Sequence, residues 1–107
     1  MHCIKNIIFM KLPQDCNNIE DVRREIDTID NEIIGLIGKR LSFIKEIIKY
    51  KNNAEDVYAK DRYNTVIARR RELAKINKLN PDVIEGIYRI LMDYFIKEQF
   101  VLLNKKK

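Results

Sequence analysis

The chain has 107 residues, about one domain, and its hydrophobic fraction of 46% is enough for a folded core. Only three glycines and two prolines occur, which argues against a β fold with many turns. The formal net charge of +5 favours an anionic partner without distinguishing a nucleic acid, a membrane surface or a small acid. No apolar run approaches the roughly 20 residues that span a bilayer, and no secretion signal is recognisable. We therefore expect a cytoplasmic protein that does not bind a membrane.

Histidine and cysteine are too scarce for the common metal and nucleophile sites. His2 is the only histidine, and we expect Cys3 and Cys16 to be free thiols. A structural zinc site needs four nitrogen or sulfur ligands, which this set does not provide. Neither a glycine-rich phosphate loop nor a Ser-His-Asp set can be assembled. We expect no metal and no cofactor, so any chemistry must use arginine, lysine, glutamine and carboxylates.

A long first helix is predicted from Ile19 to about Lys51. Asn18 is a good N-cap, and acidic residues follow it in the first turn, where the helix dipole favours negative charge. The two asparagines after Lys51 mark the end of the helix. We expect residues 1–11 to form a flexible N-terminal extension.

A second helix is predicted from Lys60 or Asp61 to about Asn77. The arginines at positions 69–71 are spread over about 200° of its circumference, so we interpret them as solvated surface. The hydrophobic residues assigned to the inner side of this helix are Val66, Leu73 and Ile76.

A third helix is predicted from Pro81 to about Leu103, with Asn80 as its N-cap. Residues 105–107 are all lysine, and we expect them to form a basic, solvated and frayed tail. The three helices together predict a single helical domain over residues 12–104.

Large hydrophobic residues recur along the first helix with alternating steps of four and three residues. At 1.5 Å per residue this helix is roughly 50 Å long, whereas the other two are roughly 25 Å and 33 Å. A compact domain of this size has a radius of gyration of only about 13 Å, so two shorter helices cannot cover the whole stripe. The sequence therefore predicts an all-α fold, with three-helix protomers in an intertwined homodimer. The stripe comprises Val22, Ile26, Ile29, Ile33, Leu36, Phe43 and Ile47.

Arg40 occupies a position in this stripe where a hydrophobic residue is expected. A dry, unpaired arginine is very costly, so either its stem reaches water or an anion belongs beside it. In a continuous α-helix Lys51 would lie only about 20° around the axis from Arg40 and about 16 Å along it. The two cations could bind a small dianion between them, or both could extend into solvent.

Arg23 and Gln99 are two further candidates. Arg23 lies about 25 Å along the helix from Arg40, so it can serve the same small ligand only from a second subunit. Alternatively, it is a solvated residue of the first turn. Gln99 is the only amide on the inner face of the third helix, where it either satisfies a packing defect or binds a ligand. That face comprises Ile84, Tyr88, Leu91, Phe95, Gln99 and Leu102.

One set of spacings is fairly specific. It consists of Val22-Arg23-x-x-Ile26-Asp27-x-Ile29-Asp30, followed by Arg40, Lys51, Arg62 and Gln99. Over residues 12–103 this arrangement resembles the all-helical chorismate mutase family, which includes the isochorismate pyruvate-lyases of salicylate synthesis.

The resemblance implies two equivalent active sites in an interlocked dimer. Arg40 would bind one substrate carboxylate, and Arg23 of the other subunit would bind the second. Lys51 and Gln99 would donate hydrogen bonds to the ether oxygen of the breaking C–O bond, while Arg62 would close over the ligand. Chorismate is a dianion that rearranges in a pericyclic step, so placed donors and a compact conformer are what a protein can supply.

Three positions differ from the residues that are common in the chorismate mutases which the chain resembles. Ala59 and Tyr63 stand where mutases commonly have acidic residues, and Phe95 stands where a small hydroxyl residue is common. These departures favour the lyase branch, so isochorismate pyruvate-lyase is the alternative to chorismate mutase. A basic helical dimer without enzymatic activity is the third hypothesis. If it bound nucleic acid, its cations would lie on an exposed face rather than on apolar ones.

Overall fold

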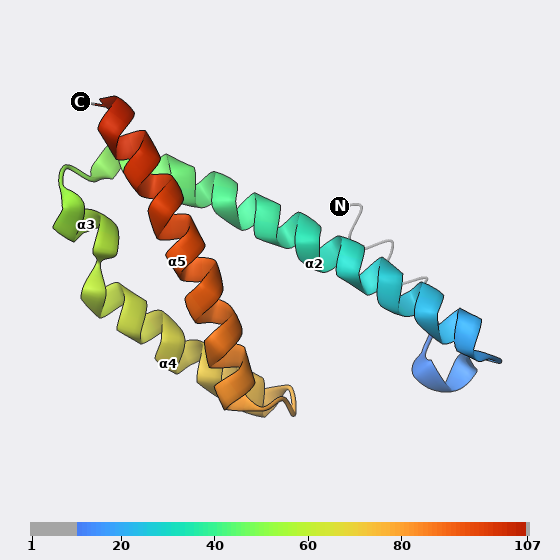
Figure 1. Ribbon diagram of the computed structural model, residues 1–107. Helices are drawn as coiled ribbons and strands as arrows, with labels where there is room; N and C mark the ends of the chain where they lie inside the picture. Colours follow the sequence, from blue (N-terminus) through green and yellow to red (C-terminus); the bar gives the residue numbers. More distant parts are fainter. Residues whose placement is uncertain (1–10, 107) are drawn as a thin grey trace. The chain divides into compact units, whose positions relative to one another are not determined.

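The computed structural model describes residues 11–106, and all regular secondary structure in this part of the chain is helical (Figure 1). The all-α prediction is therefore confirmed. The chain forms two compact units, of which one ends at Arg40 and the other begins at Leu41. Within the described residues, none of the helices combines the length and hydrophobicity needed to cross a bilayer.

The first unit contains a short 3₁₀ helix, η1 (Pro13–Asp15), and most of the long helix α2 (Ile19–Ile47). The predicted N-cap is confirmed, because Asn18 Oδ1 accepts a hydrogen bond from the backbone N–H of Asp21 at 2.9 Å. The Asp21 carboxylate in turn accepts the backbone N–H of Asn17 at 3.1 Å. That bond, with help from Lys11 and Arg24, lowers the pKa of Asp21. These contacts fix the start of α2.

The hydrophobic stripe of α2 remains exposed in the single chain. No residue of α2 is buried. The seven stripe residues keep between 38% of their surface, at Ile47, and 68%, at Phe43. A helix whose apolar face is this open needs something to cover it.

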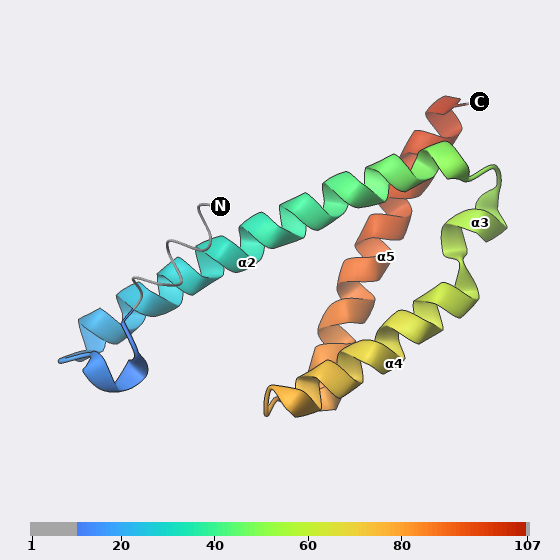
Figure 2. The same ribbon diagram turned by 180° about the vertical axis from the view of Figure 1, so that it is seen from behind.

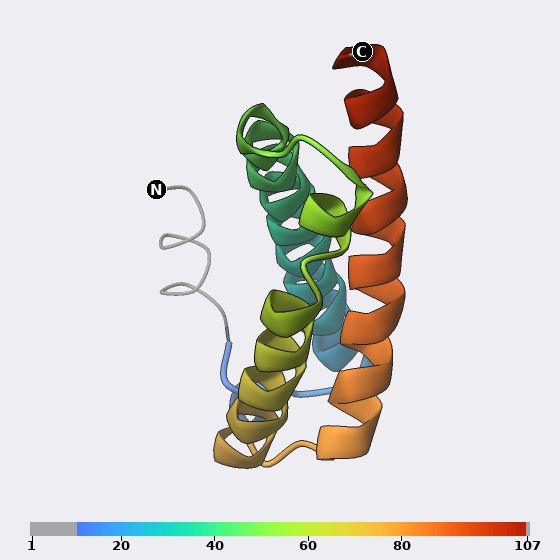
Figure 3. The same cartoon turned by 90° about the vertical axis from the view of Figure 1, so that its left-hand side faces the viewer.

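The second unit begins at Leu41 and is organised around α5. The short helices η2 and α3 and the longer α4 pack one after another along α5 (Figures 2 and 3). In chain order the elements after α2 are η2 (Ile48–Tyr50), α3 (Ala54–Tyr58), α4 (Lys60–Ile76) and α5 (Pro81–Lys106).

Two small hydrophobic clusters line α5. One comprises Ile48, Val57 and Leu103, with Ile96, Phe100 and Leu102 against it. The other comprises Val66, Ile67 and Met92, with Tyr63 and Tyr88 against it. The first cluster fastens η2 and α3 to the C-terminal half of α5, and the second fastens α4 to its N-terminal half.

The predicted end of the first helix is wrong by about one turn. The α-helix stops at Ile47, η2 tightens the next turn, and Lys51 has an extended backbone with φ −117° and ψ 138°. The asparagines after Lys51 do not simply terminate a helix. Asn53 Oδ1 accepts the backbone N–H of Asp56 at 2.9 Å and thereby starts α3, a helix that was not predicted.

The predicted inner side of α4 is correct only for Val66. Leu73 and Ile76 are exposed, and the buried residues of α4 are Val66, Ile67 and Ala74. Arg70, one turn after Val66 and one turn before Ala74, is half-buried, with its guanidinium 5.5 Å from the ring centre of Tyr88. The interpretation of the arginine run as solvated surface is therefore wrong for Arg70.

The same interpretation is also wrong for Arg71. Its Nη1 donates to Asp82 at 2.9 Å and to Glu85 at 2.8 Å, which joins α4 to the first turns of α5.

The start of α5 agrees with the prediction, since Asn80 Oδ1 accepts the backbone N–H of Asp82 at 2.9 Å and Pro81 is the first helical residue. The helix continues to Lys106, three residues beyond the predicted end at Leu103. The frayed tail is therefore wrong for Lys106, whose ammonium is bonded to backbone carbonyls. A single domain over residues 12–104 stays a prediction. Cys3 and the predicted flexible extension, except for Lys11, lie outside the described residues.

Candidate active site

Lys51 and Gln99, which are 48 residues apart in sequence, meet in the second unit. Lys51 directly follows η2, and Gln99 lies on α5. The distance from Lys51 Nζ to Gln99 Oε1 is 3.0 Å. An ammonium can only donate, so the oxygen of the amide must face Lys51, and the amide NH₂ is left to donate elsewhere.

Gln99 is the only polar residue classed as buried among those the structure describes. Only 5% of its surface is exposed, and Phe95, one turn earlier, and Leu103, one turn later, are buried on the same side of α5. A buried amide needs partners, and Lys51 supplies one of them. The predicted position of Gln99 on the inner face of the third helix is therefore confirmed.

The ammonium of Lys51 is partly withdrawn from water. This burial lowers the pKa of Lys51 from its usual 10.5, while the nearby Asp56 carboxylate raises it. Partial burial also strengthens any hydrogen bond that the ammonium makes to a developing negative charge. Lys51 and Gln99 together form a pair of donors backed by an apolar surface.

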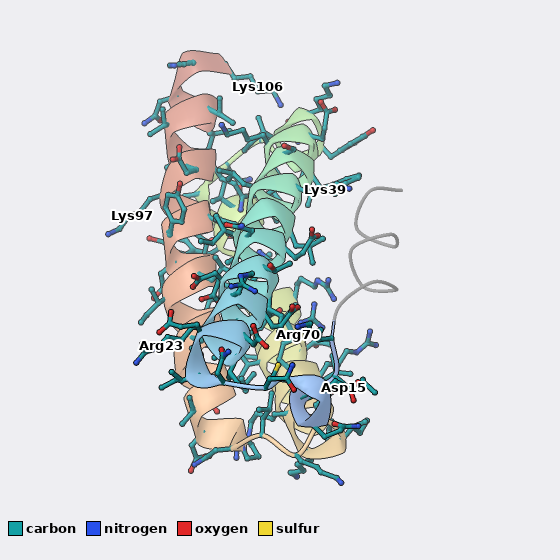
Figure 4. All side chains as sticks on the ribbon, turned by 90° about the vertical axis from the view of Figure 1, so that its right-hand side faces the viewer. Asp15, Arg23, Lys39, Arg70, Lys97 and Lys106 are labelled. Carbon is teal, nitrogen blue, oxygen red and sulfur yellow. The ribbon has the colours of Figure 1, made fainter. Side chains whose placement is uncertain are left out.

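The backbone of Lys51 and of the preceding η2 turn makes hydrogen bonds of its own, apart from the side-chain bond to Gln99. The N–H of Lys51 donates to the carbonyl oxygen of Ile48 at 3.2 Å. Lys106, on the last turn of α5, extends toward η2 and donates to the carbonyls of Ile48 and Lys51 at 2.8 Å and 2.9 Å (Figure 4). Lys106 was not predicted, because its lysine-rich surroundings in the sequence indicate a solvated tail.

The three arginines of the predicted site lie on two helices, Arg23 and Arg40 on α2 and Arg62 on α4. Arg62 is exposed in the first turn of α4, in the second unit. Arg23 and Arg40 belong to the first unit, where Arg40 is half-buried at the unit's last position. Arg23 is exposed near the start of α2, and its Nη1 is 3.3 Å from Glu20 (Figure 4). The structure thus brings Lys51 and Gln99 together, and the gathering of the three arginines around one ligand stays a prediction.

Comparison with known proteins places the chain in a family. Residues 22–100 match the family model for chorismate mutase type II. The chain belongs to this family. It is 30% identical to the isochorismate pyruvate lyase of Pseudomonas aeruginosa over 90 residues, which are 84% of this chain and 89% of that protein.

Two further relatives match a large part of this chain. The chorismate mutase of Methanocaldococcus jannaschii is 29% identical over 77 residues, covering 71% of this chain and 78% of that protein. The T-protein of Haemophilus influenzae is 33% identical over 85 residues, but the match spans only 22% of its length. The chain is therefore similar in extent to the first of these relatives and much shorter than the second.

The three positions that depart from the usual chorismate mutase pattern supply no free acidic group in this structure. Ala59 has a left-handed backbone (φ 42°, ψ 57°) where α3 gives way to α4. The hydroxyl of Tyr63 donates to Asp93 at 3.1 Å. Phe95 is among the most deeply buried side chains, with 1% of its surface exposed. The surroundings of Gln99 are correspondingly more apolar than a serine or threonine at position 95 would make them.

Proposed function

We propose that the chain is an enzyme of the chorismate mutase type, which rearranges chorismate to prephenate. The observation that carries this proposal is the 3.0 Å contact between Lys51 and the buried Gln99 in a chain of this family. If Lys51 were only a solvated lysine and Gln99 only a packing residue, there would be no reason for their side chains to form a hydrogen bond. An ammonium and an amide held side by side form a donor pair for one oxygen.

The reaction suits such a pair. In the pericyclic step one C–O bond breaks while one C–C bond forms within the same dianion, so no nucleophile is used. Negative charge grows on the ether oxygen, where Lys51 and Gln99 can donate. Donors already oriented in a site of low polarity stabilise that charge without reorganisation. Confining the substrate to a compact conformer contributes the rest.

The two carboxylates of the substrate need cations of their own. Arg40 and Arg62 would bind from the same chain, and Arg23 would bind from a second copy. Arginine suits this role because its planar fork donates two parallel hydrogen bonds to one carboxylate. The structure leaves the guanidinium of Arg62 exposed at the start of α4, where a ligand could reach it.

An intertwined homodimer is part of the proposal, with α2 of each copy covered by the other. Its support is the stripe of α2, whose seven hydrophobic residues each keep at least 38% of their surface exposed in the described part of the chain. Monomeric proteins rarely expose an apolar patch this long. A two-fold dimer would also bring Arg23 of one copy to the site of the other, which the predicted 25 Å separation from Arg40 requires. A cytoplasmic location stays a prediction.

Isochorismate pyruvate-lyase is the second candidate function. It is favoured by Ala59, Tyr63 and Phe95, none of which offers a carboxylate or a free hydroxyl to a ring hydroxyl of the ligand. The similarity to the Pseudomonas aeruginosa lyase over most of both chains points the same way. The same cations would serve a related pericyclic elimination that releases pyruvate and leaves salicylate.

The deciding experiment gives the purified chain chorismate and isochorismate separately. Prephenate formation and salicylate plus pyruvate formation are each measured as kcat/KM. We expect turnover of at least one substrate, with Lys51→Met lowering it by about 100- to 1000-fold, the usual loss for one oriented donor. Lys49→Met is the matched control, because Lys49 is exposed and its ammonium lies 2.7 Å from the exposed carboxylate of Glu46, three residues earlier. Folded protein that converts neither substrate would overturn the proposal.

A further inference from the structure

Lys106 makes an unusual contact for a lysine near the end of a helix. Its ammonium is 2.8 Å from the carbonyl oxygen of Ile48 and 2.9 Å from that of Lys51. Both distances are typical of charge-assisted hydrogen bonds. Ile48 is the first residue of η2 and Lys51 is its C-cap, so the ammonium lies beside carbonyl oxygens of this last helical turn, where a cation is favourable.

The residue held by this contact is the proposed donor. Lys51 lies outside any α-helix, with φ −117° and ψ 138°, so no i to i−4 bond fixes its backbone. The N–H of Lys51 bonds to Ile48, its carbonyl accepts from Lys106, and its ammonium donates to Gln99. Removing Lys106 would remove the bond that the Lys51 carbonyl accepts and one of the two bonds that the Ile48 carbonyl accepts.

Gln99 and Lys106 are on the same helix, seven residues or about 10 Å apart along its axis. The last two turns of α5 therefore contact Lys51 at the tip of its side chain and at its backbone. Two contacts from one rigid element fix both the place and the direction of the ammonium. Neither contact alone would do so for a side chain with four rotatable bonds.

We propose that Lys106 is a positioning residue, which holds the η2 turn against α5 so that the ammonium of Lys51 stays beside Gln99. This inference rests on the proposed function for its effect on turnover, but not for its effect on the backbone. Lys106 itself does not contact the reacting atoms. It acts only through Lys51.

The kinetic test compares Lys106→Met with Lys105→Met, since Lys105 is exposed on the same turn and its side chain makes no hydrogen bond to a described residue. We expect Lys106→Met to lower kcat by up to about 100-fold, the loss that about 1 Å of misplacement can cause. KM should change less than about twofold, because the arginines bind the carboxylates. Lys106→Arg, which can also donate to two carbonyls, should restore most of kcat.

A double-mutant comparison separates positioning from a general loss of structure. In a Lys51→Met background, Lys106→Met should lower kcat by less than about twofold, because there is no ammonium left to position. If the two substitutions multiply instead, Lys106 acts independently of Lys51 and the proposal is overturned.

Amide hydrogen exchange tests the same proposal without turnover. The N–H of Lys51 bonds to the Ile48 carbonyl that Lys106 also contacts. We expect its protection to fall at least about tenfold in Lys106→Met and to be unchanged in Lys105→Met. Unchanged protection in both variants would overturn the proposal. If wild-type protein converts neither substrate while protection still falls as expected, the proposed function fails and the positioning contact stands.

Discussion

Replacing Gln99 with leucine should separate catalysis from stability. Leucine has nearly the same volume and fits an apolar neighbourhood, but it cannot donate to a ligand. If Gln99 donates to the ether oxygen, the loss of one oriented donor should lower kcat by about 100- to 1000-fold, or about 2.7–4 kcal/mol of transition-state stabilisation. If Gln99 is only a packing residue, the rate should hardly change.

The expected change in stability is small for reasons visible in the structure. A hydrogen bond to a charged group contributes about 1.5–3 kcal/mol, but the Lys51 ammonium is only partly buried, so water can replace most of that contact. Leucine also removes a polar amide from a site that is 5% exposed and adds apolar surface there. We therefore expect the free energy of unfolding to change by less than about 1 kcal/mol. The shift in Tm should therefore stay below about 4–8 °C, which is what 1 kcal/mol causes in a domain of roughly this size.

The measurement is kcat/KM beside Tm, at one protein concentration because dimers melt in a concentration-dependent way. Met92→Leu is the control, since Met92 is buried on the same helix two turns earlier and conserves volume. It should leave both quantities nearly unchanged. A large drop in Tm together with lost activity in Gln99→Leu, or full activity with an unchanged Tm, would refute the assignment of Gln99 as a donor.

Three other predictions follow from the same structure. Because burial lowers the pKa of Lys51 and the ammonium is the donating form, kcat/KM should fall as pH rises through a pKa below 10.5; a basic limb at or above 10.5 would contradict this. Mixing Arg23→Ala with Lys51→Ala protein should restore part of the activity through hybrid dimers; no recovery despite demonstrated subunit exchange would rule out the cross-subunit role of Arg23. Lys78 has φ 60°, so Lys78→Gly should raise the free energy of unfolding by about 0.5–1 kcal/mol in denaturant titrations. A loss of stability there would show that strain at this helix end is negligible.

The sequence was most informative where local chemistry decides the structure. Asn18 and Asn80 were predicted as N-caps because a short polar side chain before an apolar periodic run has few other roles, and both accept the expected backbone N–H. Gln99 was predicted on the inner face of its helix from the 3.6-residue period, and it is buried. Caps and periods need only a few neighbouring residues, which a single sequence contains.

Predictions that depended on neighbouring elements were less accurate. Leu73 and Ile76 are as hydrophobic as the residues that are buried, yet α4 turns Val66, Ile67 and Ala74 inward instead. The guanidinium of Arg70 lies 5.5 Å from the ring centre of Tyr88. A prediction based only on the spacing of apolar residues assigns an arginine at this position to the surface. Which face of a short helix is buried depends on the helix that packs against it, which for α4 is α5. The sequence of α4 alone does not indicate how α5 packs against it.

Lys51 shows how a residue can be identified by an argument whose geometry is wrong. It was selected because a continuous helix would put it on the face of Arg40, but α2 ends at Ile47 and Lys51 is extended. The side chain is placed instead by Gln99 and Lys106, two residues of α5. The helical period could still select Lys51 as a candidate, because the α-helix ends only four residues before it. The period could not indicate that Gln99 and Lys106 hold Lys51 in place.

The stripe of α2 is the opposite case. Its sequence pattern clearly predicts a buried face, but the stripe residues are exposed in the described part of the chain. A repeat of four and three residues is selected by burial, yet no residue of α2 is buried. Under the proposed dimer, the pattern would report the environment of the assembly rather than that of one chain. If a second copy covers the stripe, the same event that stabilises α2 would complete the site, because Arg23 lies on that helix. The stability of the fold, the fraction of dimer and the activity would then all fall together as the protein is diluted. Lys51 and Gln99 of a single chain could not by themselves cause such a dependence on concentration.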